Sequence, residues 1–191
     1  TARLDGSSSS LTLFDLGGNS QRVALFSANW GELHLHDAIG ADLTAELSAS
    51  SAAGGYLHLS DSEGVRQVNV DAGASGGSPS VVLLPATGGT APVARLSRGS
   101  QGGVLELWDP TAATRWGYLG GSGAGGGALS LYQKNGALGM SVDGDSGGAN
   151  GGGLLSLYAG DGSSSLALYG DASGAALVSL RDSGGSERIR L

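Results

Sequence analysis

The segment Gly144-Asp-Ser-Gly-Gly148 contains a serine, Ser146, in a setting that would suit the nucleophile of a serine protease. That chemistry also needs a histidine base, a buried aspartate and an oxyanion hole at fixed geometry. The three histidines, His34, His36 and His58, lie much earlier in the chain. We therefore interpret the segment as a glycine-rich turn. Because no other pair of catalytic residues emerges, we expect that the chain is not an enzyme.

Two groups of side chains have the types that bind metal ions. Asp143 and Asp145 place alternate carboxylates in one loop, which suits Ca²⁺, although a full site needs further oxygen ligands. His34, His36 and His58 have the donor type of a zinc site, but solvated histidines on an outer face are the favoured interpretation. Asp143 and Asp145 are therefore weak metal candidates. The chain has no phosphate-binding loop or dinucleotide fingerprint, and we expect no cofactor.

Aromatic residues occupy one recurring position, directly after the second residue of an apolar pair: Phe14, Phe26, Trp108, Tyr132, Tyr158 and Tyr169. Strand alternation turns this position away from the apolar side or to a corner. The favoured interpretation is that the rings cover glycine-rich neighbours and pack between repeats. The alternative is a ladder that stacks on sugars, with weak glycan-contact candidates Trp108, Tyr132, Tyr158 and Tyr169. Further contributors would be Trp30, Trp116, Tyr56 and Tyr118.

The composition indicates an ordered chain with many turns. Of 191 residues, 37 are Gly, more than twice the ordinary share of about 7%. The 40% share of hydrophobic residues argues against disorder, and the net charge of -7 argues against nucleic acid as a partner. No apolar run approaches the roughly 18–20 residues of a membrane helix, so we expect no membrane insertion. The chain has no Cys, and its start at Thr1 indicates a fragment or a processed product.

Two apolar residues separated by one other residue recur along the chain and define a repeat. The sixteen pairs are Leu11/Leu13, Val23/Leu25, Leu33/Leu35, Ala45/Leu47, Leu57/Leu59, Val68/Val70, Val82/Leu84, Ala94/Leu96, Leu105/Leu107, Gly117/Leu119, Leu129/Leu131, Met140/Val142, Leu155/Leu157, Leu166/Leu168, Val178/Leu180 and Ile189/Leu191. Every second pair starts a unit of about 24 residues, near positions 11, 33, 57, 82, 105, 129, 155 and 178. We therefore treat residues 1–191 as one repetitive region of about eight two-strand units.

The pairs predict short β-strands, because residues i and i+2 share one face of a strand. The helical pattern of apolar residues at i, i+3 and i+4 is absent. Gly-containing dipeptides midway between paired strands predict two-residue type I′ hairpin turns at Glu63-Gly64, Asn135-Gly136, Asp161-Gly162 and Gly184-Gly185. In other units the midpoint is a single residue, namely Gly18, Gly40, Gly89 or Ala112. A β-arc of a solenoid is the alternative to a hairpin.

A single sheet with one apolar face leaves that face uncovered, and two elongated all-β architectures solve the problem. Three copies can turn their apolar faces toward a common axis and form a homotrimeric triple-stranded β-helix or β-spiral shaft. A single chain can instead coil into a two-sheet β-solenoid, with leucines packed across about 10 Å. All four prolines fall in the fourth and fifth units and predict a local irregularity there: Pro79, Pro85, Pro92 and Pro110.

Two runs carry a resemblance, Gly126-Gly-Ala-Leu-Ser-Leu-Tyr-Gln-Lys-Asn-Gly136 and Gly152-Gly-Leu-Leu-Ser-Leu-Tyr-Ala-Gly-Asp-Gly162. They resemble the glycine-rich β-repeat shafts of phage tail fibres and bacterial surface fibre proteins, and Val142-Asp-Gly144 matches the end of such a repeat. This resemblance implies a homotrimeric structural protein, extracellular on a cell surface or virion, that displays an adhesive or receptor-binding tip. The alternative function is a β-solenoid adhesin that binds cell-surface glycans or another regular surface through its outer face.

Overall fold

The computed structural model describes residues 2–5, 9–15, 21–26, 31–37, 42–50, 54–73, 78–86, 91–109, 111, 114–122, 126–145, 151–170, 175–182 and 184–191. All secondary-structure elements assigned in these ranges are β-strands, so the predicted all-β class is confirmed. These ranges hold no helix with the length and apolarity of a membrane span. The chain divides into two compact units, Thr1–Val93 and Ala94–Leu191.

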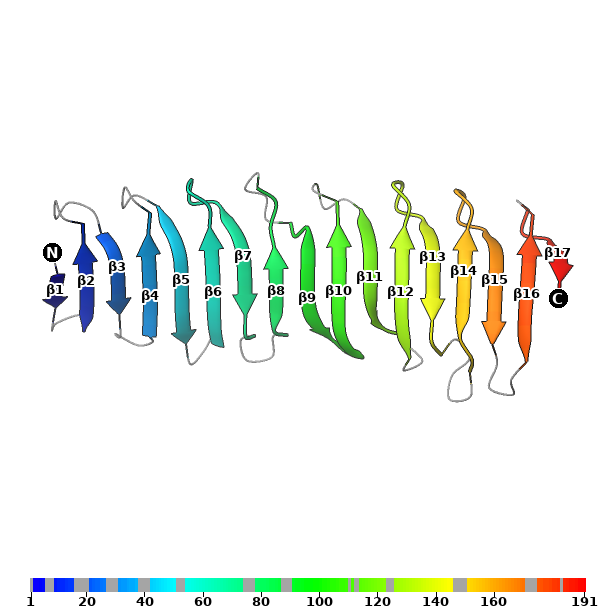
Figure 1. The fold of residues 1–191 in the computed structure, drawn as a ribbon, viewed down its shortest axis with the longest axis horizontal. Coiled ribbons are helices and arrows are strands. Elements are labelled where there is room, and N and C mark those ends of the chain that lie inside the picture. Colours follow the sequence, from blue (N-terminus) through cyan, green and yellow to red (C-terminus); the bar gives the residue numbers. More distant parts are fainter. Residues whose placement is uncertain are drawn as a thin grey trace. The chain divides into compact units, whose positions relative to one another are not determined.

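Unit 1 is an antiparallel meander in which each strand pairs with the next along the chain (Figure 1). Its strands are β1 (Ala2–Asp5), β2 (Ser10–Phe14), β3 (Gln21–Phe26), β4 (Gly31–His36), β5 (Leu43–Ser50), β6 (Gly54–Ser60), β7 (Arg66–Asp71) and β8 (Ser80–Leu83). The sequence pattern did not predict β1, which places Leu4 opposite Leu11 of β2.

Unit 2 is a second antiparallel meander of sequence neighbours (Figure 1). Its strands are β9 (Ala94–Gly99), β10 (Gly102–Trp108), β11 (Arg115–Gly121), β12 (Gly127–Tyr132), β13 (Leu138–Asp143), β14 (Leu154–Tyr158), β15 (Ser164–Gly170), β16 (Ala176–Arg181) and β17 (Glu187–Arg190). The boundary between the units falls inside the fourth repeat, close to Pro85 and Pro92. That is the region in which the prolines predict an irregularity.

Strand β8 corrects one of the predicted apolar pairs. Val81 and Leu83 lie opposite the apolar pair of β7. The predicted pair, Val82/Leu84, is therefore wrong by one residue. All four residues from Val81 to Leu84 are apolar, so alternation within the strand cannot distinguish the two registers, and the pairing with β7 decides between them.

The tight turns after β6, β12, β14 and β16 share a geometry that differs from the predicted one. After β12, the N–H of Gly136 donates to the carbonyl oxygen of Gln133 (2.9 Å), and the N–H of Gln133 donates to that of Ala137 (2.8 Å). Gly136 has a positive φ of 83°, whereas Asn135 has no positive φ. The loop is therefore a three-residue type I turn closed by a glycine, and the predicted two-residue type I′ turn is wrong. The need for glycine holds, with φ of 74–85° at Gly64, Gly136, Gly162 and Gly185.

A β-bulge accompanies every described hairpin within a repeat. Seven pairings shift register directly after the second apolar residue of the first strand, as between Leu131 and Tyr132. The pairings that join successive repeats show no shift. In each unit the bulged turns thus lie at one end of the strands, which we call the upper end from its place in Figure 1. The predicted single-residue midpoints Gly18, Gly40, Gly89 and Ala112 lie outside the described residues.

Aspartate begins several of the upper turns and fixes their backbone. Oδ1 of Asp61 accepts hydrogen bonds from the N–H groups of Glu63 and Val65, both at 2.9 Å. Its Oδ2 accepts one from Nε2 of Gln67, the extra residue of the bulge, at 2.7 Å. Asp182 makes the equivalent contacts in the last hairpin of unit 2. Turn and bulge are therefore held by one carboxylate.

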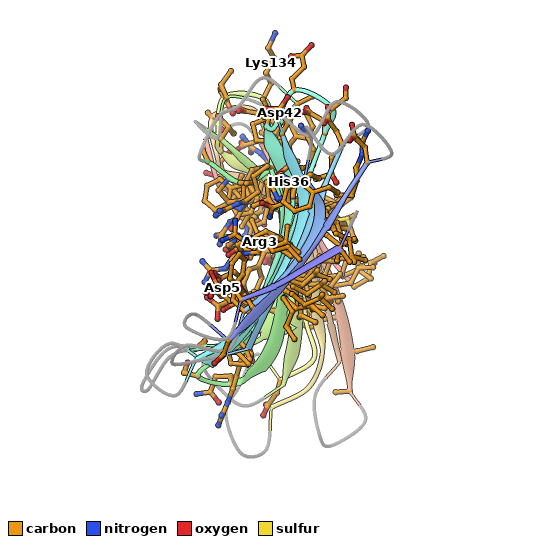
Figure 2. All side chains as sticks on the ribbon, turned by 90° about the vertical axis from the view of Figure 1, so that its left-hand side faces the viewer. Arg3, Asp5, His36, Asp42 and Lys134 are labelled. Carbon is orange, nitrogen blue, oxygen red and sulfur yellow. The ribbon has the colours of Figure 1, made fainter. Side chains whose placement is uncertain are left out.

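The two faces of each sheet differ in chemistry. Apolar pairs lie directly opposite one another from strand to strand, as Leu33 and Leu35 lie opposite Leu25 and Val23. Within each unit the predicted pairs therefore share one face, which we call the leucine face; in unit 1, Val81/Leu83 takes the place of Val82/Leu84. The residues between them form the polar face. Figure 2 shows carbon-only side chains on one side of the strands and side chains with nitrogen or oxygen on the other.

The most deeply buried side chains are small and lie on the polar face. Ala24 is 0% exposed, Ala167 2%, Ser179 1%, Ser48 2% and Ser156 4%. A larger side chain of the neighbouring strand contacts one of them, since Oγ of Ser179 donates to Oε2 of Glu187 (2.9 Å). Within each unit the leucines therefore do not form the buried layer, in line with a single sheet that leaves its apolar face uncovered.

Candidate functional site: the leucine face and the polar face

The leucine face of each unit is an apolar surface open to solvent. In unit 1, Leu35 is 38% exposed and Leu47 is 51% exposed; in unit 2, Leu119 is 52% and Leu131 is 44% exposed. Neighbouring strands lie about 4.8 Å away on either side and cover the flanks of each leucine, but not its tip. A contiguous apolar surface of this kind is typical of an interaction site.

The polar face of unit 1 gathers two histidines around one carboxylate. His34 of β4, Glu46 of β5 and His58 of β6 stand opposite one another in consecutive strands. The hydroxyl of Tyr56 donates to Oε1 of Glu46 (2.5 Å), and Nδ1 of His58 lies 3.4 Å from Oε2. Nε2 of His34 lies 3.8 Å from Oε1 of Glu46 and 3.4 Å from Oε2 of Glu32. The side chain of Glu46 is only 16% exposed, so this carboxylate depends on these partners.

These contacts shift the titration of two groups. Burial alone would raise the pKa of Glu46, but hydrogen bonds from Tyr56 and His58 and the attraction of both imidazoles outweigh it and hold the pKa below its ordinary value. The hydrogen bond to Glu46 is the largest cause that raises the pKa of Tyr56. The cluster therefore holds the carboxylate of Glu46 in its charged form, and its role is structural.

The histidines do not form the zinc site that their residue type allows. Glu46 separates His34 from His58, and Nε2 of His36 instead lies 3.3 Å from Nε2 of Gln21. Among the residues that the structure describes, no group of three His, Asp or Glu side chains is arranged to hold a metal ion.

The polar face of unit 2 holds an arginine among aromatic rings. Nη1 of Arg115 donates to Oε1 of Glu106 (3.1 Å), and its Nη2 donates to the hydroxyl of Tyr132 (2.5 Å). The guanidinium carbon lies 4.9 Å from the ring centre of Tyr132, 5.0 Å from that of Tyr118 and 6.0 Å from that of Trp108. Burial alone would lower the pKa of Arg115, but the hydrogen bonds to Glu106 and Tyr132 outweigh it and raise the pKa.

The recurring aromatic residues lie on the polar face, and the structure does not order them into a free ladder. Trp108 and Tyr132 are engaged by Arg115, and Tyr158 contacts Ser141. Tyr169 is 37% exposed at the lower end of β15. These contacts agree with the interpretation in which rings cover neighbouring strands. Trp30 lies outside the described residues.

The acidic loop after β13 forms a local turn in the part that the structure describes. Oδ1 of Asp143 accepts a hydrogen bond from the N–H of Asp145 (3.0 Å). A β-carbon on Gly126 would lie 2.7 Å from Cβ of Asp145, so Asp145 packs against the residue that directly precedes β12. Ser146, the serine of the protease-like segment, lies outside the described residues.

Sequence reasoning missed Glu46 and Arg115, which organise the two polar clusters. A signal for Glu46 exists, because it lies between Ala45 and Leu47 as His34 and His58 lie between their leucines. Arg115 gives no such signal, because it lies at the start of β11, across the bulge from Trp108. Comparison of the chain with protein-family models and with curated proteins finds no match.

Proposed function

We propose that this chain is a structural protein, a repetitive shaft segment of an extracellular or virion fibre that assembles as a homotrimer through its leucine faces. The observation that carries the proposal is the leucine face itself, which is apolar from strand to strand and uncovered within each unit. In the assembly, three leucine faces turn toward a common axis and supply the core that one chain lacks. The shaft would hold an adhesive or receptor-binding tip away from the cell or virion.

The size of the face supports association between copies. Nine strands about 4.8 Å apart, with two rows of side chains about 7 Å apart along each strand, give unit 2 an apolar face of roughly 600 Å². Unit 1 adds a similar area. A stable interface covers about 800 Å² per partner. A shaft that covers both faces would therefore bury an area typical of a permanent assembly.

The pairing of the strands supports copies rather than a single-chain solenoid as the cover. A solenoid pairs each strand with one in the next coil, whereas every described strand pairs antiparallel with its sequence neighbour. Within each unit, a meander paired in this way does not return over its own leucine face. A second chain with the same spacing between strands is a matching surface for it.

The test compares substitutions on and off the paired leucine-face rows of β11. Leu119 is 52% exposed on the leucine face, and Trp116 is 48% exposed at the bulge, outside the paired rows. Light scattering should show three chains per particle for the unmodified protein, a concentration-dependent loss of trimer for Leu119→Asp, and no loss for the control Trp116→Asp. A folded protein that is a monomer at all concentrations would contradict the proposal. Equal loss of trimer in both variants would do so as well.

A further inference from the structure

From β2 to β6 the leucine face is not flat, because the exposure of its side chains alternates. In β2 to β6 the second residue of each apolar pair is 38–51% exposed, namely Leu13, Leu25, Leu35, Leu47 and Leu59. The first residue of each pair is less exposed, namely Leu11, Val23, Leu33, Ala45 and Leu57. The exposed tips form projections, and the less exposed positions beside them form recesses.

Antiparallel order turns this alternation into a checkerboard. The upper row of the face, nearer the bulged turns, contains Leu13, Val23, Leu35, Ala45 and Leu59, and the lower row contains Leu11, Leu25, Leu33, Leu47 and Leu57. Projections therefore lie in the upper row on β2, β4 and β6, and in the lower row on β3 and β5. In unit 2 the same alternation holds for Leu119 on β11 and Leu131 on β12, but not on β10, where Leu105 and Leu107 are 39% and 44% exposed.

A cyclic assembly brings different rows together at the same level. Rotation about an axis parallel to the stack of strands leaves β4 of one copy level with β4 of the next. At each corner between two sheets, the upper end of one copy then meets the lower end of the next. Such a heterologous contact closes into a ring when all copies are equivalent. Over β2 to β6 the checkerboard supplies the complement, because each of these levels carries one projection and one recess in opposite rows.

We infer that the copies pack in parallel and in register, with the upper row of one copy seated on the lower row of the next copy at the same strand level. On β4, Leu35 of one copy enters the recess over Leu33 of its neighbour; on β5 the direction reverses, and Leu47 enters the recess over Ala45. This inference rests on the proposed function and adds to it the orientation, the level and the contacting residues.

Cysteine cross-linking tests the register, since the chain has no native Cys. Sheets packed face to face lie about 10 Å apart, farther than the Cα separation of a disulfide, so a bifunctional maleimide that spans this gap is used. Leu33→Cys and Leu35→Cys proteins, one carrying a larger tag, are refolded together and treated with the cross-linker. We expect a covalent product that joins the two proteins, and no covalent product when either protein is refolded alone. The matched control is Leu35→Cys with Leu57→Cys, whose strands lie two levels apart, and we expect at least a tenfold lower yield.

The outcomes separate the register from the assembly itself. Self-linking of Leu35→Cys alone, or equal yields from the matched and mismatched mixtures, would overturn the register while leaving the trimer intact. A trimer by light scattering with no mixed product would do the same. A monomer in light scattering would remove the proposed function as well. If either β4 variant fails to fold, Leu57→Cys with Leu59→Cys on β6 repeats the test at another level.

Discussion

Gly121 and Gly127 lie directly opposite each other on β11 and β12, yet only Gly121 is packed against other atoms. A β-carbon on Gly121 would lie 2.7 Å from the carbonyl oxygen of Gln101 and would also clash with Cβ of that residue. A β-carbon on Gly127 would meet nothing within 4 Å. The two glycines thus have different reasons to be present, although they form one cross-strand pair.

Gly121→Ala should destabilise the protein by about 1–3 kcal/mol, because the backbone of Gln101 must move to admit the methyl group. The control Gly127→Ala should leave stability unchanged or raise it by about 0.5–1 kcal/mol, since alanine restricts the unfolded chain. Urea unfolding curves of both variants measure the difference. Equal changes in the free energy of unfolding would show that the close approach of Gln101 to Gly121 does not affect stability.

Replacing the turn glycine should cost stability without the loss of any contact. Gly136 has a φ of 83°, and an alanine there should lose about 1 kcal/mol through backbone strain. Gly136→Asn should lose less, because asparagine tolerates the left-handed region better. Lys134→Ala in the same turn serves as the control. Melting temperatures that rank Asn below Ala would argue against the assigned backbone conformation.

Arg115 should not be replaceable by lysine. A lysine keeps the charge but loses the planar group that bonds Glu106 and Tyr132 while lying against three rings, and we expect a loss of about 1 kcal/mol. The exposed Arg98 has no described side-chain partner, so Arg98→Lys should be neutral. Chemical unfolding followed by tryptophan fluorescence compares the two. A neutral Arg115→Lys would show that charge alone is sufficient at this position.

Glu46 should make stability depend on pH. Its pKa is lower in the folded chain than the ordinary 4.5, so its contribution is present above about pH 4.5 and is lost as the pH falls through the folded value. Glu46→Gln removes this contribution. The stability difference between the unmodified protein and the variant should therefore be largest near pH 6 and shrink toward pH 3. Urea midpoints at each pH give the difference, and a constant gap would refute the assignment.

Much of the fold could be predicted because the two signals in each repeat are local. Leu129/Leu131 with Met140/Val142 predict two strands, and Gly136 predicts the turn between them. The bulge at Tyr132 could not be predicted from the apolar pairs. It adds one residue to β13 beyond these pairs and leaves them directly opposite each other. The predicted apolar pair of β8 was wrong for a related reason, since the residues from Val81 to Leu84 are all apolar and do not alternate with polar ones.

The candidate site was predicted in part. The pattern identifies the apolar face and places His34 and His58 in one row. It does not predict that burial among the described residues is deepest at Ala24 and Ser179, the second of which contacts Glu187 of the neighbouring strand. Such burial depends on rotamers and cross-strand contacts, which alternation does not encode. Alternation likewise does not encode the cover of Leu119 and its neighbours by other chains, which depends on the proposed assembly.

Because each strand pairs only with its neighbours in sequence, a whole repeat can be gained or lost without disturbing the rest. Recombination between the DNA segments that encode similar repeats would change the protein in steps of about 24 codons, or two strand spacings, close to 10 Å. A one-codon insertion inside a strand would instead turn the side chains in the rest of that strand to the opposite face, unless a bulge absorbs the extra residue. Evolution can therefore change the length of the array in steps of one hairpin.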